Sequence, residues 1–126
     1  MELQFPKKEL TYLKRVLWEA KNEEHTQELK LPESMPDVGK ILGLWGQPLI
    51  RGKEWRGNGM GVNGGILVWV LYQPEDGGEP RMLDTWIPFQ MRWDFPQTQR
   101  DGSMRVCCGL RSIDGRSTSA RKLMVR

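Results

Sequence analysis

The sequence Gly64-Gly65-Ile66-Leu67-Val68-Trp69-Val70-Leu71-Tyr72 contains the longest uninterrupted apolar run of the chain. Its β-branched and aromatic residues favour a strand, and the run is far shorter than the roughly 20 residues of a membrane-spanning helix. Both faces of this strand would be apolar, because side chains alternate between the two faces of a sheet. One face would carry Ile66, Val68 and Val70, and the other would carry Leu67, Trp69 and Leu71. The run therefore predicts a central strand that is covered on both sides.

Further strand-like segments, separated by turn residues, flank this run. Residues 44–55 form an extended segment before a Gly57-Asn58-Gly59 turn, and residues 74–78 form the next turn. Residues 87–95 alternate in polarity, which predicts a half-buried strand whose early part, at Pro88, is an edge or a bulge. Residues 104–110 alternate in the same way, and an Asp114-Gly115 turn precedes a last strand in residues 117–125.

The first third of the chain is more varied. Residues 26–31 resemble a short strand that Pro32 stops. Ser34, Pro36 and Asp37 are typical of a helix start and Gly43 of a helix end, so a short helix is predicted near residues 36–43. Residues 9–21 fit one face of a helix and one face of a strand equally well, and periodicity leaves both open.

Together these segments predict a mainly β fold. We expect an antiparallel β-sandwich or barrel-like sheet of about six to seven strands, with the one short helix near residues 36–43. The 126 residues suffice for a single domain, residues 1–126, that folds without metal or disulfide. Because the strand pattern persists to Arg126, we also expect the native polypeptide to continue beyond this sequence.

The composition is that of an ordinary globular domain, with 38% apolar residues, 28% charged residues and a formal net charge of +3. The basic excess lies in residues 99–126, where the arginines stand apart among apolar residues. This spacing favours the solvated face of a strand over an anion-binding stripe, and we expect no nucleic acid partner. These arginines are Arg105, Arg111, Arg116, Arg121 and Arg126.

The cysteines and the N-terminus bear on the cellular compartment. Cys107 and Cys108 are adjacent, so on a strand they would point to opposite faces and could not easily bridge each other. We expect them to be reduced core residues of a cytoplasmic protein. Residues 1–9 lack the apolar segment of a signal peptide, and no transmembrane segment is expected.

Motifs for catalysis or cofactor binding are weak. Residues 59–64, Gly-Met-Gly-Val-Asn-Gly, match the GxGxxG string but precede an apolar strand instead of opening a helix, so we interpret them as a turn or bulge. His25 is the single histidine and lies among charged residues, which favours a surface position over a metal or nucleophile partner. Glu33 and Asp37 favour turn and cap roles over an acid/base pair. We expect no enzyme activity, no cofactor and no metal.

The six tryptophans offer the remaining functional candidates. Trp69 and Trp93 fall on strand faces that we expect to be buried, whereas other tryptophans lie beside charged or polar residues. An aromatic side chain beside charges can form a contact surface, although packing in the core or at its rim is the alternative. The candidate interaction surface consists of Trp45, Arg51, Trp55, Arg56 and Trp86.

Three segments, taken in order and spacing, point to a known family. They are Leu31-Pro32-Glu33-Ser34-Met35-Pro36-Asp37-Val38-Gly39-Lys40-Ile41-Leu42, then residues 64–72, then Trp86-Ile87-Pro88-Phe89. Together they resemble the SPOCS domain of spore-coat morphogenetic proteins, which include the stage VI sporulation protein D type and its LysM-bearing clostridial counterpart. The resemblance covers roughly residues 10–126.

The resemblance implies a β-rich, non-enzymatic module that helps coat proteins assemble and encase the forespore from the mother-cell side. Implied partners are other spore-coat proteins, with the basement-layer ATPase, stage IV sporulation protein A, as a candidate, and a homo-oligomer is a further expectation. It also favours a strand in residues 9–21. The alternative hypothesis is a carbohydrate- or nucleic-acid-binding β-domain that uses surface tryptophan and arginine side chains.

Overall fold

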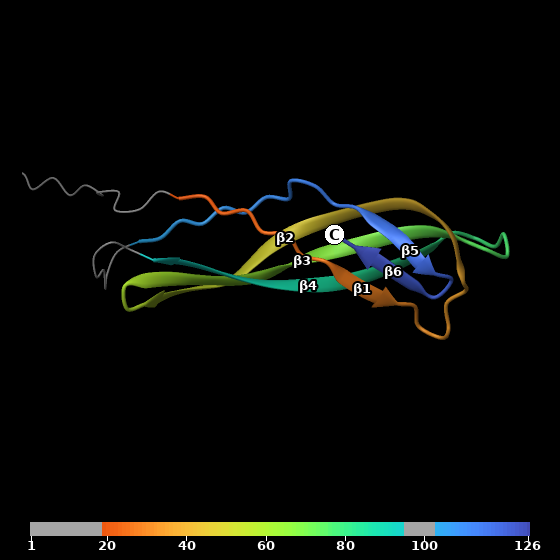
Figure 1. Cartoon of the computed structure of the whole chain (residues 1–126), viewed down its shortest axis with the longest axis horizontal. Helices are drawn as coiled ribbons and strands as arrows, with labels where there is room; N and C mark the ends of the chain where they lie inside the picture. The colour runs from red at the N-terminus through yellow and green to blue at the C-terminus, as the bar shows by residue number, and fades with distance from the viewer. Residues whose placement is uncertain (1–18, 95–102) are drawn as a thin grey trace, which may run out of the picture.

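The computed structural model describes residues 19–94 and 103–126, and all regular secondary structure in these residues is β (Figure 1). The strands are β1 (Gln27–Lys30), β2 (Val38–Arg56), β3 (Gly59–Pro74), β4 (Arg81–Asp94), β5 (Gly115–Ser119) and β6 (Lys122–Val125). The prediction of a mainly β fold is confirmed. No helix long enough to span a membrane occurs in the described residues.

The strands form two antiparallel three-stranded sheets. In the large sheet the order is β2-β3-β4, so the apolar run lies in the central strand, as predicted. Gly57 closes the β2–β3 turn with a φ of 57°, a conformation that glycine adopts without steric cost. In the small sheet the order is β1-β6-β5, so strands from the two ends of the described chain pair with each other. Figure 1 shows the small sheet beside one half of the long one.

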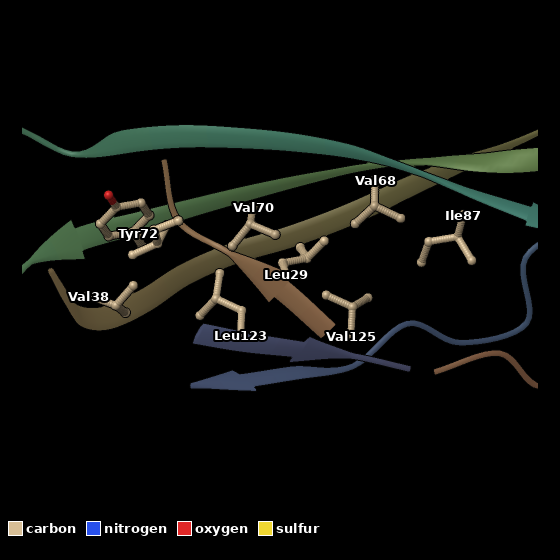
Figure 2. Packing of buried hydrophobic residues seen from close by; sticks show 9 residues of the cluster. Leu29, Val38, Val68, Val70, Tyr72, Ile87, Leu123 and Val125 are labelled. Atoms are coloured by element: carbon tan, nitrogen blue, oxygen red, sulfur yellow. The ribbon is translucent and has the colours of Figure 1, made fainter. Parts of the chain in front are cut away.

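The main core lies between the two sheets. Figure 2 shows its side chains between the ribbon of β3 and those of β1 and β6. Val68, Tyr72 and Leu123 are completely shielded from solvent. We call the side of the large sheet that faces this core its inner face. The buried residues of the cluster are Leu29, Leu31, Val38, Val68, Val70, Tyr72, Ile87, Leu123 and Val125.

A second apolar cluster covers the inner face at the other end of the large sheet. It is built on Met60, Val62 and Trp93. The segment after residue 102 runs past it in an extended form without joining a sheet, and its Met104 packs on the cluster. The ammonium group of Lys21 lies 5.5 Å from the centre of the Trp93 ring, a cation–π distance. Segments from both ends of the described chain therefore close this part of the core.

Hydrogen bonds fix the turn between β1 and β2. The Arg121 guanidinium donates to the carbonyl oxygens of Pro32 at 2.7 Å and Met35 at 2.5 Å. The Tyr72 hydroxyl donates to the carbonyl oxygen of Pro36 at 2.8 Å. These bonds satisfy carbonyl groups that no sheet partner reaches, and burial raises the pKa of the Tyr72 hydroxyl. The segment between β1 and β2 is thus anchored to β3 and to the β5–β6 turn.

The predicted helix near residues 36–43 is wrong, because residues 38–43 belong to β2. The Val38 amide donates to the carbonyl of Ala120 at 2.9 Å, and Ile41 pairs with Tyr72 of β3. A helix of two turns is only marginally stable by itself, so sheet pairing determines the conformation. Ser34, Pro36 and Asp37, which resemble a helix start, instead belong to the turn before β2 that Arg121 holds.

Other expectations differ in detail. The alternation in residues 104–110 does not form a strand, because these residues have no sheet partner, and Cys107 and Cys108 are exposed free thiols rather than core residues. Of residues 9–21, only residues 19–21 are described, and they lie outside the sheets. The described strands are not joined into a closed barrel, because no strand pairing links the two sheets.

Truncation of Leu123 tests the main core. The Leu123→Ala variant should lose about 2–5 kcal/mol of unfolding free energy, because it removes buried methyl groups and leaves a cavity between the sheets. Urea denaturation followed by tryptophan fluorescence measures the loss. Lys122→Ala, on the exposed side of the same strand, is the control and should change stability by less than about 1 kcal/mol. Equal stability of the two variants would contradict this account of the core.

Tyr72 predicts a specific loss of stability at alkaline pH. Its folded-state pKa lies above the ordinary value of about 10, so the unfolded chain releases the proton more readily. The contribution of the protonated Tyr72 hydroxyl to the unfolding free energy is therefore fully present below pH 10 and is lost as the pH rises through the folded-state pKa. In Tyr72→Phe, which also loses the bond to Pro36, the unfolding free energy measured between pH 8 and pH 11 should decline less steeply than in the wild type. Parallel pH profiles would contradict the prediction.

Candidate protein-interaction face

The face of the large sheet that points away from the core is rich in apolar side chains. Val68 and Val70 are buried toward the core, so the alternation of β3 places Leu67, Trp69 and Leu71 on the opposite side. Gly65 lies on this side as well, and the residues paired with these four positions share it. We call this set the outer apolar face; it comprises Trp45 and Leu49 from β2, Leu67, Trp69 and Leu71 from β3, and Met82 and Trp86 from β4.

Two indole rings lie side by side at the middle of this face. Trp45 and Trp69 are direct cross-strand partners. Their ring centres are 6.4 Å apart and their planes are inclined by 24°, which is a stacked arrangement. The stack presents a broad aromatic surface that the sheet holds in place.

A glycine and an arginine fix a third indole ring. The ring of Trp86 lies on the backbone of Gly65, so close that a Cβ atom at that position would lie 2.3 Å from ring carbons. The guanidinium of Arg51 lies 4.0 Å from the centre of the same ring, on a cation–π contact. Gly65 of β3 and Arg51 of β2 therefore hold the Trp86 ring of β4 against the sheet.

The outer apolar face is open among the described residues. Trp45, Leu49 and Met82 are 42%, 38% and 51% exposed, while the other members shield one another in part. These three belong to the small group of large apolar side chains that the described chain leaves exposed. A clustered apolar surface of this kind is typical of a contact site, whereas single exposed apolar residues are common on any protein.

Polar groups are few on this face. Gln47 lies opposite Leu67 and Asp84 lies opposite Trp69, and both are exposed. Together with Arg51, the face carries one acidic and one basic side chain within its apolar area, in keeping with the scarcity of charged residues at the centre of protein contact surfaces. The polar groups would orient a partner, and the aromatic rings would supply the buried area.

The free edges of the large sheet are less suited to binding. Pro48 lies in β2 and Pro88 in β4, and their β3 partners, Ile66 and Gly65, are neighbours in the chain. β2 also has register irregularities at three places along its length. Proline and bulges on edge strands oppose the addition of a further strand. The position of Pro88 on an edge strand confirms that prediction.

The structure places the predicted surface residues on different sides of the sheet. Trp45, Arg51 and Trp86 share the outer apolar face, as described above. Trp55 packs in the second cluster on the inner face. Arg56 ends β2, and its side chain lies outside what the structure describes.

Sequence reasoning missed two features of the outer apolar face. It expected Trp69 to be buried, although Trp93 is buried as predicted. It also expected cover on both sides of β3, but among the described residues only the inner face is covered. Because a strand covered on both faces and a strand with one exposed apolar face both have a continuous apolar run, the strand sequence alone does not distinguish them.

The other residues considered for metal binding or catalysis do not form a common site among the described residues. In the described residues no three His, Cys, Asp or Glu side chains gather as a metal site would require. The Nε2 atom of His25 lies 3.1 Å from a carboxylate oxygen of Glu23 at the surface. Asp37 receives a 3.0 Å hydrogen bond from Arg121, a structural role, and Glu33 is exposed. The glycines of the GxGxxG string lie within β3 and are followed by more strand.

The concave features of the surface are shallow. One hollow of about 350 Å³ lies beside Pro36 and Asp37, and another of about 250 Å³ lies over Gly61 and Asn63. Neither contains the tryptophan stack.

No family model, no curated protein and no solved structure matches the chain.

The Gly65→Ala substitution tests how Trp86 is held. The added methyl group would overlap the ring, so we expect Trp86 to move, its contact with Arg51 to break and stability to fall by about 1–3 kcal/mol. Chemical denaturation and the NMR resonance of the Trp86 indole N–H measure these effects. Gly109→Ala is the control, because no atom lies within 4 Å of its added Cβ. An unmoved Trp86 resonance in Gly65→Ala would contradict the packing described.

Proposed function

We propose that this chain is a non-enzymatic protein-interaction module that acts in spore-coat assembly. The observation that carries the proposal is the outer apolar face, where the exposed Trp45 ring stacks on the half-buried Trp69 ring of the neighbouring strand. A fully buried indole side chain removes about 150–250 Å² from water, worth roughly 4–6 kcal/mol before opposing terms. Trp45 is already more than half shielded in the free chain, so covering this face with a partner would gain only part of that free energy, most of it from a few aromatic residues.

The coat context comes from the three segments that resemble the SPOCS domain. Two of them contribute directly to the outer apolar face, since residues 64–72 supply its central strand and residues 86–89 supply Trp86. The third forms the turn that Arg121 and Tyr72 anchor. In this proposal the two sheets act as a sandwich-like scaffold on the mother-cell side of the forming spore. Coat proteins are the partners, and the basement-layer ATPase, stage IV sporulation protein A, is a candidate among them.

A second candidate function is binding of a carbohydrate or a single-stranded nucleic acid. The near-parallel rings of Trp45 and Trp69 favour it, because sugars and bases both stack on flat aromatic surfaces. Arg51 could contact a phosphate or a hydroxyl group. This hypothesis is distinguished by salt, since binding dominated by phosphate contacts weakens steeply with ionic strength and binding to a coat protein need not.

Localisation of a fluorescent fusion in sporulating cells tests the proposed function. The wild-type fusion should gather around the forespore during coat formation, and Trp45→Ala should disperse it because the aromatic stack is lost. Arg116→Ala, an exposed change on the small sheet, is the control and should localise as the wild type does.

Thermal unfolding of purified Trp45→Ala checks that the fold is retained, which its 42% exposure leads us to expect. A uniform cytosolic signal of the wild type throughout coat formation would overturn the proposal. Salt-sensitive binding to oligonucleotides, or binding to glycans, that Trp45→Ala abolishes would instead support the second candidate.

A further inference from the structure

We infer that the partner on the outer apolar face is a second copy of this chain, packed face to face about a twofold axis. The inference rests on the proposed function in one respect only, namely that this face is used for protein contacts. Three features of the molecule support a twofold dimer. They are the prolines on both edge strands of the large sheet, the positions of Arg51 and Asp84, and the size of the outer apolar face.

The edge strands of the large sheet oppose strand addition, so self-association would use the outer apolar face. An edge-to-edge dimer would add a strand to β2 or β4, and each of these strands carries a proline near the middle of its length. The inner face is occupied by the small sheet and by the second cluster. The outer apolar face is the remaining broad surface of the large sheet among the described residues.

The two charges of the face suit a twofold partner. Arg51 lies on β2 over Trp86, whereas Asp84 lies on β4 opposite Trp69. They therefore occupy opposite edge strands and different levels along the sheet. Consider a twofold axis that lies in the plane of the face and crosses the line between the two residues at its midpoint and at a right angle. This axis exchanges their positions, so each Arg51 would meet the Asp84 of the other copy. In such an interface the same surface serves both subunits, and an acidic and a basic group at exchanged positions form two ion pairs.

The size of the face fits a weak dimer. Three strands about 4.8 Å apart, over about nine residues of about 3.3 Å each, give a flat footprint of about 400 Å² per copy. Two copies would bury about 800 Å² of flat footprint, and more accessible surface because indole rings stand above the plane. This area is below the range of stable specific interfaces and within that of weak, transient contacts. We therefore expect a dissociation constant in the micromolar range and a dimer that depends on concentration.

Charge reversal tests the orientation as well as the stoichiometry. Sedimentation velocity or light scattering of the full chain, at concentrations from about 1 μM to 1 mM, should show a monomer–dimer equilibrium. Arg51→Glu and Asp84→Arg should each weaken dimerisation at least tenfold, because like charges then face each other. The double variant should recover most of the affinity, since the pairs are restored with reversed sign. Arg116→Glu on the small sheet is the control and should leave the dimer unchanged.

The outcomes separate this inference from the proposed function. A chain that stays monomeric up to 1 mM, or a dimer that the single reversals do not weaken, would overturn the inference. So would failure of the double variant to recover, with circular dichroism showing that it is folded. If the chain is monomeric but Trp45→Ala still disperses the fusion around the forespore, the proposed function stands and the partner is another protein. If the dimer obeys the charge rules but the fusion never gathers there, the inference stands and the coat function fails.

Discussion

The pairing of β3 with a strand on each side determines how the other parts of the molecule are placed. Its residues are hydrogen-bonded to β2 along one side and to β4 along the other. With both backbone edges satisfied, its two faces are left to differ only in what covers them. One face is buried by Leu123 and Val125 of β6, and the other carries Trp69. Core and candidate interaction face are therefore opposite sides of the same strand.

Much of the large sheet could be predicted from the sequence, because local patterns there agree with tertiary structure. The apolar run in residues 66–72 identified the central strand, and Pro88 identified an edge. The short helix failed because two turns of helix-compatible sequence are outweighed by pairing with β3. The strand predicted in residues 104–110 is absent for another reason: Met104, Val106 and Leu110 are partly buried as their alternation suggests, but Cys108 is exposed and these residues have no strand partner. Periodicity reports which side is buried and is silent about hydrogen-bond partners.

The candidate site was harder to predict than the fold. Residues such as Trp45, Arg51 and Trp86 were selected for being aromatic or charged near one another in sequence, yet what unites them is strand register. A bulge in β2 between Ile50 and Gly52 changes which residues share a face, and Trp55 beyond it belongs to the inner cluster. Single-residue irregularities of this kind are invisible in the sequence, since one residue more or less exchanges the two faces.

The order of the small sheet has a consequence for biosynthesis. β1 lies near the start of the described chain and pairs with β6 near its end. In chain order β2, β3 and β4 are complete before residues 122–125 are made. The inner face of the large sheet therefore stays uncovered until β6, which buries it, has been made. The small sheet, and with it the main core, can therefore form only after nearly all of the described chain has been made.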